Sequence, residues 1–574
     1  MAEGGSGRGR ALAVCGIFLA FIWWSKCVVS AGTTPKYLDF RVESNRRYPL
    51  GQAERMIKAL NLLPGVSDSP SDLLNSDGID SDEVGGPRIV EKELKLNIKG
   101  VSGSASTTDD LGQNAGYFKL PGTHASKMFY FFFESRNNRT TDPVLLWMTG
   151  GPGCASELAL FYENGPFKIA SDLSLVWNDY GWDKISSIIF VDQPIGTGFS
   201  YSTDIRDLRH DEDGVSEDMY DFFQEFFKLH PEYAGNDFYV TGESYAGHYV
   251  PAVTTRIYKG NKDKKGIHIN LKGFAIGNGL TQPDIQYEAY ADFALENGII
   301  DNSDYKRLSL IYPACAASIK LCGSKGTLTC IAAYLVCNSL FNSILSIAGN
   351  INYYDIRKEC VGDLCYDFSN LETFLNQESV KEALGVGDRK FVSCSPLVYE
   401  AMIVDWMRNL EAGIPALLED GVKLLVYAGE YDLICNWLGN SRWVTAMDWS
   451  GQIEYAKADW KTFEVEGEKA GLVTSYGPLS FLKVSNAGHM VPMDQPKNAL
   501  EMIHRWTRGK SLESGEQLAQ TLQAATVVAH SEKVKQELEE LVLDDGQKST
   551  TDLRDITLEE KVERKEKGGA FVDW

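Results

Sequence analysis

The sequence FYVTGESYAG, residues 238–247, reveals the fold of this 574-residue chain. Four residues of strand type are followed at once by GESYAG, and residues 248–259, which come next, can form a helix. A serine in a G-x-S-x-G sequence between a strand and a helix sits on a sharp, strained turn, where glycines on both sides avoid collisions. The context therefore favours a nucleophilic Ser244 over a serine in an ordinary tight turn.

Apolar runs of strand length recur on both sides of this turn, at 127–134, 143–148, 188–191, 422–427 and 479–484. Helical patterns lie between several of them, for example at 215–229. Continuous apolar strands that alternate with helices are typical of a mostly parallel sheet with helices on both faces. Together with the turn at Ser244, this pattern predicts an α/β fold of the α/β-hydrolase type.

Residues from about 285 to 400 interrupt the alternation. This region is rich in cysteines and in helical patterns. We interpret it as a disulfide-rich helical insertion over the sheet, since insertions at the carboxyl ends of strands are where a cap controls access to a site.

Two residues downstream of Ser244 are candidates for its catalytic partners. A serine hydroxyl needs an imidazole to take its proton, and the imidazole needs a carboxylate to orient it. In α/β-hydrolases the three residues follow the order Ser, Asp, His. Asp432 follows the apolar run VKLLVY, and His489 follows LSFLKV. Each alone reads as a loop residue; together, in this order, they predict a catalytic triad.

A glycine-rich segment, TGGPG at 149–153, ends the run at 143–148. An oxyanion that forms during acyl transfer needs main-chain donors close to the substrate carbonyl, and glycines allow that approach. A glycine-rich turn without a ligand is the alternative.

Seven strings resemble the serine carboxypeptidase family, closest to its plant type III (vacuolar or secreted) branch. In chain order they are WMTGGPGCASE, FYENGPF, VDQPIGTGFSYS, TGESYAGHYVP, IGNGLTQP, YAGEYDLICNWLGN and VSNAGHMVPMDQP. The resemblance runs from about Tyr117 to Trp506. It implies that Ser244 is the nucleophile, His489 the general acid/base and Asp432 its orienter, with the amides of Gly151 and Tyr245 as the oxyanion hole.

The resemblance also implies a site for the free carboxylate of the substrate. Members of the family bind it with Glu243, with the amide of Gly150 and with an asparagine, which Thr149 replaces in this chain. Glu163 resembles a family glutamate that supports this network. Because two facing carboxylates repel each other unless they share a proton, Glu243 predicts peptide cleavage that favours acidic pH.

The cysteines agree with an oxidising compartment. The spacing permits nested pairing of Cys315 with Cys337 and of Cys322 with Cys330. The resemblance implies two more pairs, Cys360–Cys365 and Cys154–Cys394. Cys435 is then left as a free thiol near the catalytic centre, so we expect mercurials to inhibit; a packed, inert cysteine is the alternative.

The two ends of the chain read as processing segments and extensions. Arg8 and Arg10 precede an apolar run at 11–24, so we expect a signal peptide over 1–31, with an uncleaved signal anchor as the alternative. Residues 32–104 are a candidate propeptide or linker, and a floppy arm fits them equally well. A carboxypeptidase domain over 105–508 and a charged extension over 509–574 complete the chain. Asn138 begins a glycosylation sequon, consistent with the secretory pathway and a vacuolar or extracellular location.

The formal charge of −23 argues against nucleic acid or an anionic membrane as a partner. We expect no membrane contact after removal of the signal. We expect peptide or protein C-termini as substrates, and the sequence leaves open whether the chain forms a homodimer. Neither a metal nor an organic cofactor is expected, since Ser/His/Asp chemistry is self-sufficient and no Cys/His cluster has zinc spacing.

Three functions are compatible with these residues. The first is a serine-type carboxypeptidase that acts through an acyl-enzyme. The second is an acyltransferase of the same fold, although relatives of that kind tend to carry Asp where this chain has Glu243. The third is a non-enzymatic stabilising or binding protein.

Overall fold

The computed structural model describes residues 89–93, 113–323, 326–362 and 364–514. A large sheet forms the centre, in the strand order β1-β2-β3-β7-β4-β8-β9-β10-β13-β12-β11. Its strands are β1 Ile89–Glu93, β2 Gln113–Lys119, β3 Lys127–Phe133, β4 Val144–Met148, β7 Ser187–Val191, β8 Phe238–Glu243, β9 Leu271–Gly277, β10 Lys423–Gly429, β11 Lys461–Val465, β12 Glu468–Tyr476 and β13 Leu479–Val484. β5 Phe167–Ile169 and β6 Leu175–Trp177 form a separate hairpin.

The middle of the sheet is parallel. β7, β4, β8, β9, β10 and β13 pair in parallel, and the strands outside them, β1 to β3 and β11 to β12, pair antiparallel. Parallel strands of this kind end at one edge, where the loops that follow them meet. The sheet therefore confirms the predicted α/β class and places the ends of β4, β8, β10 and β13 at the same edge.

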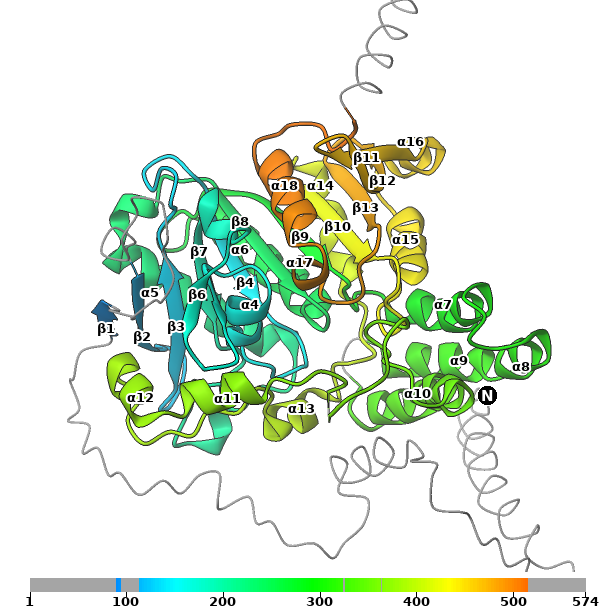
Figure 1. The fold of residues 1–574 in the computed structure, drawn as a ribbon, viewed down its shortest axis with the longest axis horizontal. Coiled ribbons are helices and arrows are strands. Elements are labelled where there is room, and N and C mark those ends of the chain that lie inside the picture. The colour runs from blue at the N-terminus through cyan, green and yellow to red at the C-terminus, as the bar shows by residue number, and fades with distance from the viewer. Residues whose placement is uncertain (1–88, 94–112, 324–325, 363, 515–574) are drawn as a thin grey trace, which may run out of the picture. The chain divides into compact units, whose positions relative to one another are not determined.

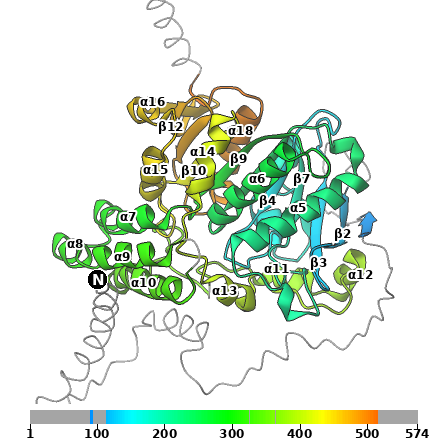
Figure 2. The same cartoon turned by 180° about the vertical axis from the view of Figure 1, so that it is seen from behind.

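Helices cover both faces of the sheet (Figures 1 and 2). The described helices are α4 Glu157–Tyr162, α5 Glu212–Leu229, α6 Ala246–Lys262, α7 Pro283–Glu296, α8 Asn302–Leu308, α9 Tyr312–Cys322, α10 Leu328–Ala348, α11 Ser369–Leu375, α12 Glu378–Leu384, α13 Pro396–Met402, α14 Ile414–Glu419, α15 Trp437–Ala446, α16 Gln452–Lys457, α17 Val491–Asp494 and α18 Pro496–Thr507.

The continuous apolar runs have a simple cause. In β4, Leu146 packs in the core on the α5 and α6 side, whereas Leu145 and Trp147 pack in the core on the α4 and α18 side. A strand that is buried on both faces carries apolar residues at every position, without alternation.

The region between β9 and β10 contributes no strand to the sheet in its described part, which forms helices α7 to α14. Disulfides Cys315–Cys337 and Cys322–Cys330 join α9 to α10. Figures 1 and 2 show α7, α8, α9 and α10 gathered beside the sheet. The position of this group after β9 agrees with the expected helical insertion.

Helix α10 is the described helix that is long and apolar enough to cross a membrane, by length and composition alone. Half of its apolar stretch is buried inside the protein, and its Cys330 and Cys337 are bonded to α9. These contacts make α10 the core helix of the insertion. The expected signal peptide, most of the candidate propeptide and the segment after residue 514 lie outside the described residues.

Candidate active site

Ser244 lies on the turn between β8 and α6, with a backbone φ of 68°. Left-handed backbone is uncommon for a residue other than glycine and marks a constrained position. The turn is held by the Ser244 amide, which donates to the Gly277 carbonyl over 3.0 Å, and by Gly242, where a Cβ would lie 2.6 Å from the Met148 carbonyl oxygen. A side chain larger than hydrogen at 242 would push β8 away from β4, so the sequence motif has a steric origin.

Asp432 and His489 meet at the ends of β10 and β13. The Nδ1 of His489 lies 2.8 Å from Oδ2 of Asp432, and both side chains are buried. The Asp432 carboxylate also accepts from the amides of Ile434 at 3.1 Å and Cys435 at 3.2 Å. With Nδ1 engaged by the carboxylate, Nε2 is the imidazole nitrogen left to act on a substrate or a hydroxyl.

Asn278 is a further partner of Asp432 that the sequence pattern does not predict. Its side-chain amide donates to Oδ2 of Asp432 over 2.8 Å, and its Oδ1 accepts from the Gly429 amide at 3.1 Å. Asn278 has a φ of 39° and is fully buried. It thus ties the ends of β9 and β10 to the carboxylate. The sequence feature that could have drawn attention to Asn278 is its position directly after a strand, in the string IGNGLTQP.

The glycine-rich loop after β4 packs directly on the turn at Ser244. A Cβ at Gly150 would lie 2.4 Å from the Tyr245 amide nitrogen and 2.8 Å from Cβ of Ser244. Only glycine allows this approach. Within the described part of the chain, the amides of Gly151 and Tyr245 donate to no main-chain carbonyl. Donors of this kind beside a nucleophile are what an oxyanion requires.

Thr149, which stands where the family has an asparagine, contacts two neighbouring side chains. Its hydroxyl oxygen accepts from the indole Nε1 of Trp147 at 3.0 Å, and its amide donates to Oγ of Ser156 at 3.3 Å. The hydroxyl proton of Thr149 can still be donated to a ligand.

Glu243 and Glu163 form a buried carboxyl pair next to the pocket. Burial and the proximity of Glu163 raise the pKa of Glu243 well above its ordinary value, and burial also raises the pKa of Glu163. Two such groups hold one proton between them, because the doubly ionised state would place two charges in a poorly solvated space. Glu243 lines the pocket, and Glu163 lies behind it.

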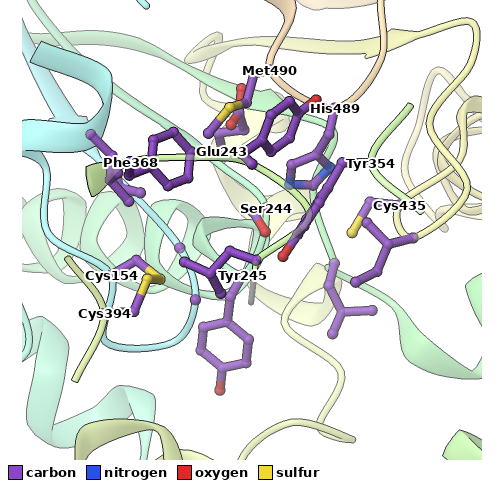
Figure 3. A pocket seen from close by; sticks show the side chains of 18 of the residues that line it. Cys154, Glu243, Ser244, Tyr245, Tyr354, Phe368, Cys394, Cys435, His489 and Met490 are labelled. Carbon is purple, nitrogen blue, oxygen red and sulfur yellow. A yellow bond between two sulfur atoms is a disulfide. The ribbon is translucent and has the colours of Figure 1, made fainter. Parts of the chain in front are cut away.

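One pocket brings together most of the residues selected from the sequence (Figure 3). Thr149, Gly150, Gly151, Glu243, Ser244, Tyr245 and His489 line it. Figure 3 shows the side chains of Ser244 and His489 directed into this pocket. The remaining wall is mostly apolar and aromatic, from residues such as Leu158, Tyr290, Tyr354, Phe368, Trp406 and Met490. Asp432 is behind His489, bonded to its ring.

The structure contains the four disulfides Cys154–Cys394, Cys315–Cys337, Cys322–Cys330 and Cys360–Cys365. Cys435 is a free, buried thiol on the pocket wall. Burial, with the nearby Asp432 and Glu243, raises the pKa of Cys435 well above its ordinary value. The thiol form therefore dominates, and inhibition by mercurials stays a prediction.

The strand order and the strand–serine–helix turn define the class of the protein, a serine hydrolase of the α/β-hydrolase fold. Comparison with known proteins narrows this class to a family. The serine carboxypeptidase family model matches residues 104–509. The chain belongs to that family and is a serine-type carboxypeptidase.

Curated relatives cover most of the chain. Serine carboxypeptidase 3 of Hordeum vulgare is 59% identical over 489 residues, which is 85% of this chain and 94% of the relative. Serine carboxypeptidase-like 49 of Arabidopsis thaliana is also 59% identical, over 85% of this chain and 94% of its own length. Among solved structures, the prohormone-processing carboxypeptidase Kex1 from Saccharomyces cerevisiae is 25% identical, with a TM-score of 0.62, over 78% of this chain and 95% of its own.

Proposed function

We propose that the protein removes C-terminal residues from peptides and proteins through an acyl-enzyme on Ser244, and that it works best at acidic pH. The observation that carries the proposal is the 2.8 Å hydrogen bond between Asp432 and His489 beside a pocket that also contains Ser244. This arrangement supports an imidazole base, oriented by a carboxylate, in the same pocket as the Ser244 hydroxyl.

In the proposed reaction, the Ser244 hydroxyl attacks the carbonyl carbon of the last peptide bond while Nε2 of His489 takes its proton. The amides of Gly151 and Tyr245 stabilise the oxyanion. His489 then gives the proton to the leaving amine, and the C-terminal residue departs. Water, activated by His489, releases the shortened peptide from Ser244.

Recognition of the terminal carboxylate is proposed for Glu243, Thr149 and the Gly150 amide, with Glu163 sharing the proton of Glu243. A protonated carboxyl can donate to the substrate carboxylate, whereas an ionised one repels it. Since the pKa of both glutamates is raised, the pair stays protonated through the acidic range and loses its proton as the pH rises. Binding of substrate is therefore expected to weaken toward alkaline pH.

The variant Glu243→Gln tests this part of the proposal, because an amide donates at every pH. For a blocked dipeptide with a free carboxylate, we expect the KM of the unmodified enzyme to rise by about tenfold per pH unit once the shared proton is lost, and the KM of the variant to vary far less. Glu157→Gln is the matched control, since Glu157 is an equally buried glutamate that does not line the pocket. Parallel KM profiles for Glu243→Gln and the unmodified enzyme would contradict the proposal.

Blocked dipeptides with free or amidated carboxyl ends test the reaction itself. A carboxypeptidase cleaves the free form much faster and releases an amino acid in water alone. An acyltransferase would require an added alcohol as acceptor, and a binding protein would turn over neither substrate. Ser244→Ala is the control for contaminating peptidases.

We also propose that the protein matures in the secretory pathway and works in the vacuole or the extracellular space. Four disulfides support an oxidising compartment. Asn138 supports it as well, because this sequon residue is exposed and Thr140 donates its hydroxyl to Oδ1 of Asn138 over 2.7 Å. A mass shift on treatment with a glycosidase, lost in Asn138→Gln, is the expected result.

A further inference from the structure

We infer that the outer edge of β2 is a docking site for an extended peptide segment with a carboxylate at its centre, that this chain fills the site with its own residues 89–93, and that Glu91 is the anchor. β1 is the outermost strand of the sheet, next to β2 (Figure 1). It lies upstream of residue 104, where the match to the family begins. The contacts of the segment are far from the reacting groups, and the inference does not depend on the proposed reaction.

A row of three residues across the sheet shows how the segment is held. Glu91 lies opposite Gly116 on β2, and Gly116 lies opposite Tyr130 on β3. Residues directly opposite each other on neighbouring strands point to the same face. Because Gly116 has no side chain, the Glu91 side chain can cross β2, and its Oε1 accepts from the Tyr130 hydroxyl over 2.9 Å.

A second contact reaches the same carboxylate oxygen from a different element. Nε2 of His230, which follows α5, lies 2.9 Å from Oε1 of Glu91. The side chains of His230 and Glu91 are only 10% and 15% exposed, so water screens the pair weakly. A tilted ring contact with Phe226, with ring centroids 4.8 Å apart, helps to hold the imidazole in place.

The titration of His230 agrees with this contact. Burial lowers its pKa and the hydrogen bond to Glu91 raises it, and the net shift is upward. Among the described residues, the other charged group that faces this imidazole is Glu232, 3.6 Å from Nδ1 and 60% exposed. Tyr130 and His230 thus converge on one oxygen, and both belong to the catalytic domain rather than to the docked segment.

The docking has a consequence for processing. Strand pairing and the contacts of Glu91 are noncovalent, so they do not depend on the chain between 94 and 112. A cut between 94 and 112 would leave the segment attached, and the processed protein would consist of two chains.

Hydrogen–deuterium exchange of the full chain tests the docking. We expect those amides of 89–93 that point toward β2 to be protected in the unmodified protein, and to exchange at least tenfold faster in Glu91→Ala and in Tyr130→Phe. Glu232→Ala is the matched control, since it removes a carboxylate beside the same imidazole but leaves the Glu91 contacts; its exchange should be unchanged. Unaltered protection of β8 in each variant shows that the fold is intact. Exchange of 89–93 at the rate of a free peptide in the unmodified protein would overturn the inference, and so would equal protection in Glu91→Ala.

A cut chain tests the predicted two-chain product. The recognition sequence of a site-specific protease is introduced into the full chain at residue 104, the protein is cleaved, and native size-exclusion chromatography follows. We expect the N-terminal fragment to elute with the catalytic domain, and to separate from it in Glu91→Ala. Separation in both proteins would overturn the docking, and co-elution in both would overturn the role of Glu91.

Discussion

Asn278 shows, at the scale of single residues, how much of the site depends on a contact outside the three predicted catalytic positions. Its side-chain amide donates to Oδ2 of Asp432, the same oxygen that is hydrogen-bonded to Nδ1 of His489. Without this bond, the amides of Ile434 and Cys435 alone would hold the carboxylate, and the carboxylate would orient the imidazole less firmly. Asn278 is therefore a positioning residue, since it acts on the reaction through Asp432.

Substitution of Asn278 should lower kcat more than it alters KM. Asn278→Gly removes both hydrogen bonds and tolerates the φ of 39°, and Asn278→Asp places a second carboxyl against Asp432. A hydrogen bond to a charged group contributes about 1.5–3 kcal/mol, so kcat should fall by about 10- to 100-fold in the glycine variant and further in the aspartate variant. The downfield NMR signal of the His489 Nδ1 proton should shift in both. Unchanged kcat and an unchanged signal would show that Asn278 only supports the fold.

Disulfide Cys154–Cys394 matters at the scale of elements, because it fastens the glycine-rich loop after β4 to the chain before α13. Main-chain bonds reinforce the link: the Ala155 amide donates to the Ser393 carbonyl and the Ser395 amide to the Gly153 carbonyl, each over 2.8 Å. Both cysteines line the pocket. The disulfide thus joins the insertion to the loop that carries the Gly151 amide.

Replacing Cys154 and Cys394 together by Ala should lower kcat/KM by about 10- to 100-fold, because small displacements of an oxyanion donor are costly. The matched control is the double variant Cys315→Ala with Cys337→Ala, which opens a disulfide of the α9–α10 hairpin. That disulfide spans 22 residues, so its loss should cost about 3 kcal/mol of stability while kcat/KM stays near its original value. Equal effects of the two double variants on kcat/KM would refute a special role for the pocket disulfide.

The elements also show which parts of the structure the sequence predicts. β4, β7 and β8 could be predicted because they are buried on both faces and apolar throughout. β9 could not, since LKGFAIG contains two glycines, which weaken a strand pattern. β11 and β12 lie toward the edge, where burial is only partial and charged residues intervene.

The residues of the site can also be separated into those that the sequence predicts and those that it does not. Ser244, Asp432 and His489 could be selected because each comes just after an apolar strand, and ends of parallel strands meet at one edge. The bond of Asn278 to Asp432 could not, because it joins residues 154 positions apart without a local pattern.

The whole molecule contains three pairs of buried carboxyl groups among its described residues. Besides Glu163 and Glu243, Glu157 lies against Asp192, and Glu212 lies near Asp405. Burial raises the pKa of Asp192 and of Asp405 to about 6 each, and it raises the pKa of their glutamate partners well above the ordinary value. The native protein therefore keeps protons that the unfolded chain releases above about pH 4.

The free energy of unfolding should consequently fall as the pH rises. Each retained proton lowers the free energy of unfolding by about 1.4 kcal/mol per pH unit between the ordinary pKa near 4 and the raised pKa. The stabilisation is therefore complete below about pH 4 and is lost as the pH rises to the raised values. His248 opposes this trend below pH 6.5, because burial lowers its pKa to about 4, but it is one group against the carboxyl groups of three pairs.

Thermal unfolding between pH 4.5 and 8 should show a Tm that decreases with pH, and a shallower decrease in Glu157→Gln. A Tm that rises over this range would contradict the role of the carboxyl pairs.

Covalent labelling by a fluorophosphonate probe, located by mass spectrometry, tests the proposed catalytic centre most directly. We expect one adduct per molecule, on Ser244, formed in step with the loss of peptide cleavage. Labelling should be absent in Ser244→Ala and at least about a hundredfold slower in His489→Ala, since the hydroxyl then lacks its base. An adduct on another residue, or undiminished peptide cleavage by Ser244→Ala, would contradict the proposal.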